Sequence, residues 1–119
     1  MKQRVLVVLS CGTDNPNRAT RALFFAMTAK KKGLDCAVFL LDEGVYLAKR
    51  GIADHLQAAT GDSAADHLLY LQEYEVPLLV CTPCAVTRQM TPEDLIPGAR
   101  MAKGEELIEL ALESTVLSF

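Results

Sequence analysis

The pair Cys81 and Cys84 is the part of the chain whose residue types and spacing could do chemistry. It follows the apolar run Leu78–Val80, so a buried strand delivers the first thiol to its carboxyl end, where α/β proteins collect ligands. Backbone N–H groups of a following turn or helix are expected to lower the pKa of such a thiol and so increase its reactivity. Because Thr82 and Pro83 favour a turn, we expect a functional thiol site and not two cysteines buried for packing.

Zinc binding and a thioredoxin-like redox centre are both disfavoured by the rest of the sequence. Structural zinc needs four ligands, usually in two pairs, whereas the remaining candidates are isolated residues: Cys11, Cys36, His55 and His67. Each histidine is interpreted as a surface or helix-cap residue, and Cys36 as structural. A thioredoxin fold needs several strands and helices after its motif, and only residues 85–119 follow Cys84. We therefore predict no metal and no cofactor.

The elements before this pair form a β-α-β pattern. Val5–Leu9 and Cys36–Leu41 are continuous apolar runs, as expected for strands covered on both faces of a parallel sheet. Between them, Asn15 can cap and Pro16 can open a helix that ends at Gly33. A right-handed crossover is expected for such a unit.

The helix over residues 16–32 is expected to have two apolar faces. The first is a stripe of mostly small residues that lets the helix lie close to a sheet: Ala19, Ala22, Leu23, Ala26 and Ala29. Phe24, Phe25 and Met27 fall partly off that stripe. They predict a second apolar face, exposed unless another subunit covers it.

Helices and strands continue to alternate in the second half. A short helix is expected over residues 45–50, and a loop with one helical turn over residues 52–61. Capping-box patterns at Ser63–Asp66 and Thr91–Asp94 predict one helix ending near Tyr74 and a short one ended by Pro97 and Gly98. The chain is expected to continue with a brief strand or loop over residues 99–101 and to end with a strand over residues 115–119. Between them, a helix is predicted by an apolar stripe of Gly104, Leu107, Ile108, Ala111 and Leu112. We expect one domain over residues 1–119, a three-layer α/β/α sandwich with a mostly parallel sheet of about five strands.

Composition excludes several classes of protein. The chain has 119 residues, of which 50% are hydrophobic and 23% charged, as in a globular domain and unlike a disordered one. Its net charge of −3 without a dense basic run argues against nucleic-acid binding. No apolar run could cross a bilayer, and Val5–Leu9 is too short for a signal-peptide core. We expect a cytoplasmic protein with reduced thiols.

The chain resembles the DsrE/DsrF-like family, which includes the sulfur-relay subunits DsrE and TusD and the small YchN-like proteins. The resemblance covers nearly the whole chain and is carried by residues 76–81, 88–90 and 93–99, by residues 12–16 with Ala19, Ala22, Leu23 and Ala26, by residues 42–45 and by residues 115–119. Where the family commonly has Arg-Gly after the site, this chain has Arg88-Gln89.

The resemblance implies a sulfur carrier. Cys81 falls where sulfur-carrying members hold their persulfide cysteine, and Cys84 matches a second cysteine of the YchN-like branch. Cys84 could then resolve the persulfide, which would release sulfide and leave a Cys81–Cys84 disulfide. The expected ligand-binding residues are Cys11, Gly12, Thr13, Thr82 and Arg88. The resemblance also implies a homo-oligomer, a trimer or hexamer, that meets sulfur donor and acceptor proteins.

Two other functions remain open at this point. The same fold could be a binding or regulatory module that holds a small ligand without turnover. Alternatively, Cys81 and Cys84 could act as a dithiol redox pair. Whether a sulfur carrier of this kind is a sulfurtransferase or a passive carrier is also open.

Overall fold

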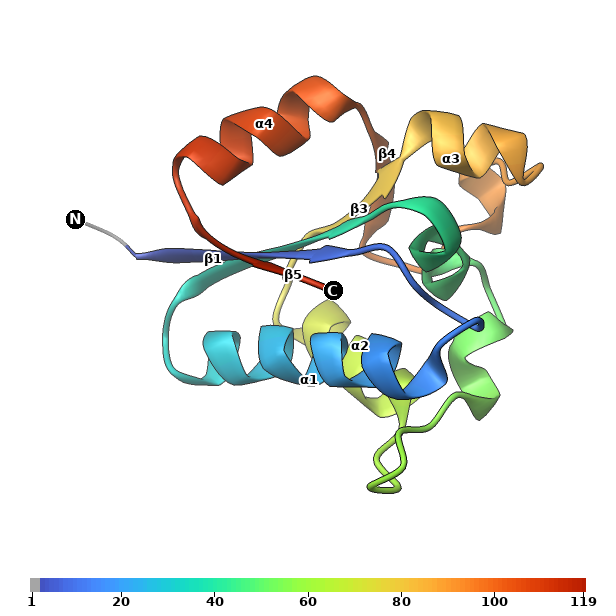
Figure 1. Ribbon diagram of the computed structural model, residues 1–119, viewed down its shortest axis with the longest axis horizontal. Coiled ribbons are helices and arrows are strands. Elements are labelled where there is room, and N and C mark those ends of the chain that lie inside the picture. The colour runs from blue at the N-terminus through green and yellow to red at the C-terminus, as the bar shows by residue number, and fades with distance from the viewer. Residues whose placement is uncertain (1–2) are drawn as a thin grey trace.

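Five parallel strands form the centre of the protein, in the order β4-β3-β2-β1-β5 (Figure 1). The computed structural model describes residues 3–119. The strands are β1 (Arg4–Leu9), β2 (Asp35–Leu40), β3 (Leu78–Cys81), β4 (Ala99–Ala102) and β5 (Thr115–Ser118). Continuous apolar runs in β1, β2 and β3 suit strands covered on both faces, which confirms the sandwich expected from the sequence.

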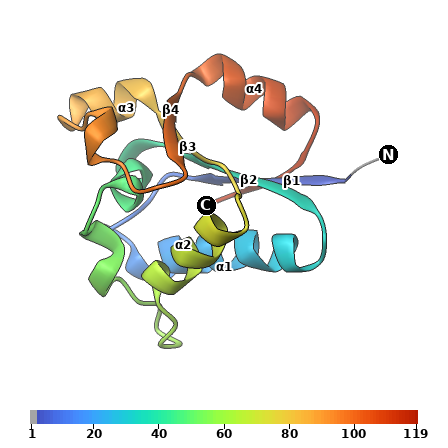
Figure 2. The same cartoon turned by 180° about the vertical axis from the view of Figure 1, so that it is seen from behind.

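Helices cover both faces of the sheet. On one side lie α1 (Pro16–Lys31) and α2 (Ala64–Glu73), and on the other α3 (Thr82–Thr87) and α4 (Gly104–Leu112) (Figures 1 and 2). Three short 3-10 helices complete the described elements: η1 (Asp42–Ala48), η2 (Ile52–His55) and η3 (Pro92–Asp94). The arrangement is a three-layer α/β/α fold.

The β1–α1–β2 unit follows the sequence prediction closely. The Asn15 side chain accepts a hydrogen bond from the Arg18 amide and caps α1. The predicted stripe of small residues is fully or almost fully buried against the sheet. At the other end Gly33 has φ +84°, and the Leu34 amide donates to the Ala29 carbonyl, so the helix ends in a Schellman motif.

Strand register brings the ends of four strands to one edge of the sheet. Leu9 pairs with Leu40, Leu40 pairs with Val80, and Cys81 pairs with Ala102. Since all the strands are parallel, the segments that leave β1, β2 and β3 start side by side. The segments that carry the predicted site residues therefore begin at this carboxyl edge of the sheet.

Several local predictions need correction. The helix expected over residues 45–50 is η1, which begins earlier, at Asp42, and is a 3-10 helix. The helix expected after Thr91 is only the 3-10 turn η3, although its capping hydrogen bond from the Thr91 amide to Asp94 Oδ2 is present at 2.8 Å. A loop with one helical turn, η2, does occupy residues 52–61 as expected.

The last helix and strand are more exposed than their apolar patterns suggested. In α4, Leu107 and Ala111 pack against the core, but Ile108 and Leu112 point away from it and are 60% and 82% exposed. The edge strand β5 has no buried residue. Within residues 3–119, no helix is long and apolar enough to span a membrane.

Candidate thiol site

Cys81 and Cys84 lie at the junction of β3 and α3. Cys81 ends β3 and is also the N-cap of α3, and Pro83 lies in the first turn of that helix. Pro suits this position because the first amides of a helix need no partner within it. Thr82 and Pro83 therefore belong to a helix and not to a free turn. Cys84 is the third residue of α3 and faces back toward its N-cap.

The structure contradicts the expectation that the pKa of Cys81 is lowered. Cys81 is only 9% exposed, and burial raises its pKa because the thiolate would lose its hydration. The thiol of Cys84 adds to this increase, whereas the Cys84 backbone N–H acts in the opposite direction. Cys84 itself is half-buried, and all four cysteines of the chain are free thiols. Cys84 is thus the more accessible member of the pair.

Asp42 brings a carboxylate to the Cys84 thiol. The Cys84 S–H points to Asp42 Oδ1 at 3.8 Å, and the same carboxylate raises the pKa of Cys81 as a minor contribution after burial and Cys84. Asp42 has φ +48°, in the left-handed region that non-glycine residues seldom adopt. Residues in this region tend to cluster at functional sites, where the surrounding fold holds them.

Two glycines hold the Asp42 loop in place. A side chain at Gly12 would place its Cβ 2.6 Å from the Glu43 carbonyl oxygen, and one at Gly44 would collide with the Leu9 carbonyl. The segments after β1 and β2 therefore touch backbone to backbone, which only glycine permits. Gly12, predicted as a ligand-binding residue, thus has a clear packing role at this edge.

Arg88 holds α3 against the same loop. Its guanidinium donates to Glu43 Oε1 from two nitrogens, at 2.7 and 3.2 Å, and to the Cys84 carbonyl at 3.1 Å. These bonds use three of the five N–H groups of the guanidinium, and Glu43 occupies the Nε–Nη2 side, which an anion could otherwise bind with two hydrogen bonds. Gln89, where the family commonly has glycine, adopts φ +59°, and the Met90 amide donates to the Ala85 carbonyl. The loop therefore keeps a shape that glycine would adopt with less strain.

Three other predicted site residues, Thr82, Thr13 and Cys11, have side chains without a hydrogen bond to either thiol in the described part of the chain. Thr82 uses its hydroxyl to bind the Ala102 carbonyl of β4 at 2.8 Å, and Thr13 is exposed. Cys11 is buried after β1, and burial, followed by the nearby Asp14 carboxylate, raises its pKa. The structure thus joins Cys81, Cys84 and Arg88 with Asp42 and Glu43, two acidic residues that were not among the predicted site residues.

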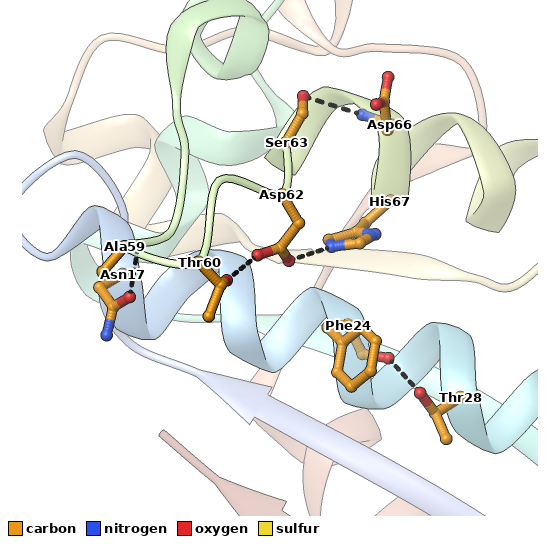
Figure 3. Close-up of polar contacts among 9 residues, drawn as sticks. All are labelled: Asn17, Phe24, Thr28, Ala59, Thr60, Asp62, Ser63, Asp66 and His67. Atoms are coloured by element: carbon orange, nitrogen blue, oxygen red, sulfur yellow. Dashed lines mark hydrogen bonds and ion pairs between the residues drawn. The ribbon is translucent and has the colours of Figure 1, made fainter.

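The region around His67 was misinterpreted from the sequence. His67 is buried, and its Nε2 lies 2.7 Å from Asp62 Oδ2 (Figure 3). A signal was available: Ser63 caps α2, which makes Asp62 the residue before the cap and His67 the fourth residue of the helix. Side chains at these two positions meet in the hydrophobic staple, and here a polar pair occupies them. Across residues 3–119, no group of three or more His, Cys, Asp and Glu is placed to hold a metal ion.

The fold and the cysteine pair define a parallel α/β/α domain with two thiols at the carboxyl edge of its sheet. The family model described as "DsrE/DsrF-like family" matches residues 3–119, and the chain belongs to that family. It is 34% identical over 112 residues to uncharacterized protein MJ0989 of Methanocaldococcus jannaschii, with 91% of each chain covered. It is 30% identical to uncharacterized protein MK0008 of Methanopyrus kandleri, over 97% of this chain and 92% of the other.

Solved structures show the same fold. The ychN protein from E. coli superimposes with a TM-score of 0.80 at 24% identity, and each chain is covered in full. Protein MTH1491 of Methanobacterium thermoautotrophicum, described as of unknown function, gives a TM-score of 0.66 at 13% identity, over 99% of this chain and 100% of the other.

Proposed function

We propose that this protein is a sulfur carrier that accepts sulfane sulfur as a persulfide on Cys81 and passes it on. Membership of the DsrE/DsrF-like family supports this proposal. The observation that carries it is the placement of two free thiols at the junction of β3 and α3. Burial of Cys81 has a cost and a benefit for such a carrier: it lowers the fraction of Cys81 present as thiolate, and it shields the persulfide from thiols in solution.

The loading step exchanges sulfur between thiols. The Cys81 thiolate attacks the outer sulfur of a donor persulfide, the donor leaves as its thiolate, and Cys81 gains one sulfur atom. In the release step, the Cys84 thiolate attacks the inner sulfur of the Cys81 persulfide. This step forms the Cys81–Cys84 disulfide and expels hydrosulfide, and an external dithiol must then reduce the disulfide before another cycle. Transfer to an acceptor thiol instead leaves Cys81 reduced.

Intact-protein mass spectrometry tests the proposal. Reduced protein would be incubated without oxygen with glutathione persulfide and weighed. We expect a gain of one sulfur atom that Cys81→Ser abolishes and that persists longer in Cys84→Ser, since the resolving thiol is gone. Cys36→Ser, which changes a thiol at the other end of the sheet, should load like the wild type. Equal loading of Cys81→Ser and wild-type protein would overturn the role of Cys81.

A dithiol redox protein is the second candidate, and the contact between the two thiols favours it. In this case, mild oxidation would join Cys81 and Cys84 with loss of two hydrogen atoms, and no sulfur adduct would form with the persulfide donor. Cys84→Ser would abolish the oxidised form. The same mass spectra therefore separate the two functions.

The proposal includes a cytoplasmic location and a homo-oligomer. Four free thiols suit a reducing compartment. The exposed apolar residues of α4 and β5 support self-association: Ile108, Leu112, Val116 and Leu117. Light scattering of the purified protein gives the oligomeric state, with a trimer or hexamer expected. If the surface is an interface, Leu112→Glu should lower the observed mass.

A further inference from the structure

A separate cavity of about 410 Å³ lies on the α1–α2 side of the sheet. Its lining residues come from α1, from the loop before α2 and from α2 itself: Arg21, Phe24, Phe25, Ala58, Thr60, Asp62 and His67. Figure 3 shows Thr60, Asp62 and His67 of the loop and α2 lying next to Phe24 of α1. The volume falls within the range of small-molecule sites.

Hydrogen bonds hold the loop that forms one wall of the cavity. The Ala59 amide donates to Asn17 Oδ1 of α1 at 2.8 Å (Figure 3). The Gly61 amide donates to the Ala58 carbonyl at 2.9 Å. Ser63 then accepts from the Asp66 amide and caps α2. The loop is thus tied both to α1 and to α2, so the cavity is formed before any ligand arrives.

The polar residues that line the cavity differ in whether their side chains have partners. Asp62 accepts from the Thr60 hydroxyl with one oxygen and contacts His67 Nε2 with the other, and these two hydrogen bonds lower its pKa. Its carboxylate is therefore ionised and already has two partners. The side chain of Arg21, by contrast, makes no hydrogen bond or ion pair with any other residue in the described part of the chain, 3–119.

We propose that this cavity binds a small carboxylic acid with an aromatic or aliphatic body. The rings of Phe24 and Phe25 meet edge to face at 5.7 Å, and with Ala58 they offer an apolar wall for the body of such a ligand. Arg21 offers a planar fork that matches a carboxylate. A cationic ligand would meet Arg21 with the wrong charge and would find Asp62 already hydrogen-bonded.

Titration with a matched pair of ligands tests this inference. 4-Phenylbutyrate and its neutral amide would each be titrated into the full-length protein and followed by NMR at the Thr60, Asp62 and His67 amides. We expect saturable shifts with the acid and weaker binding of the amide. Arg21→Gln should weaken binding of the acid roughly two- to five-fold, as for an exposed ion pair, and leave the amide unchanged. Phe24→Ala should weaken both ligands.

Arg18→Gln is the control for Arg21→Gln. Arg18 lies on the same helix, over the ring of Phe119, and does not line the cavity. Equal affinity of the acid and the amide, or equal effects of the two arginine variants, would overturn the proposal. The proposal would also be overturned if the NMR signals of the backbone amides shifted with protein concentration and not with added ligand, since a second copy of the chain would then cover the cavity. Cys81→Ser should bind like the wild type, so this result is independent of sulfur carrying.

Discussion

Cys36 and Cys81 lie on neighbouring strands at opposite ends of the sheet, and burial raises the pKa of both thiols. Cys36, near the start of β2, has a pKa of about 11 and the ammonium group of Lys30 as its charged neighbour. Cys81, at the end of β3, meets a second thiol, the amide of Cys84 and the Asp42 loop. Burial alone therefore does not distinguish the two cysteines. The two cysteines are distinguished by the groups that converge on the carboxyl edge of the sheet, namely the Cys84 thiol and amide and the Asp42 loop.

The largest expected effect is a difference in alkylation rate between the two ends of the sheet. With iodoacetamide at about pH 8, the half-buried Cys84 should react roughly 100-fold faster than Cys36, because a thiol with a pKa near 11 is almost entirely protonated there. Peptide mapping at increasing times gives the rate at each cysteine. Comparable rates at Cys84 and Cys36 would remove the distinction between a reactive edge and a structural thiol.

Cys36 should also make stability depend on pH. The folded protein holds this proton up to a pKa of about 11, whereas the unfolded thiol releases it near 9.0. Its contribution is thus complete below pH 9 and is lost as the pH rises toward 11, by up to about 2 kcal/mol in unfolding free energy. Urea unfolding of the wild type and Cys36→Val between these pH values measures the effect. Parallel pH curves for the two proteins would contradict it.

Most of the fold could be predicted because its strongest signals are local. The apolar runs of β1, β2 and β3 and the cap residues Asn15 and Gly33 act within a few residues of the elements they define. The later elements were harder. In α4, Ile108 and Leu112 follow the same helical periodicity as core residues but face outward, and only the position of the helix on the sheet decides which face is buried.

The position of the two thiols in the fold could be predicted from the sequence, but their electrostatics could not. The thiol pair and its place at the carboxyl edge follow from a strand that ends at Cys81. The raised pKa of Cys81 does not follow from the sequence of this strand, because it depends on how completely other segments of the chain cover the thiol. From the segment after another strand, Asp42 contacts the Cys84 thiol and Glu43 contacts Arg88, and that convergence comes from the order of the strands in the sheet, which the sequence does not determine.

A pair of substitutions separates strain at the thiol edge from strain at an ordinary helix end. Gln89, after α3, and Glu75, after α2, have φ values of +59° and +58°. Each is the left-handed residue of a Schellman motif that ends its helix. Gln89→Gly and Glu75→Gly should each raise the unfolding free energy by about 1 kcal/mol, since glycine adopts this conformation freely. Urea unfolding measures both. A gain for Glu75→Gly alone would indicate that the site requires glutamine at position 89.

Asp42→Asn should have the smallest effect and test the carboxyl edge most directly. Removing the carboxylate lowers the pKa of Cys81, so its alkylation at about pH 8 should accelerate about two- to three-fold, with the pH profile displaced to lower pH. Asparagine tolerates the left-handed backbone of Asp42, so the loop is preserved. Asp35→Asn makes the same change in net charge at the amino edge and should leave Cys81 unaffected. Because Asp42 is exposed, the acceleration should shrink in concentrated salt; an acceleration independent of salt would mean that the substitution had opened the loop instead of removing a charge.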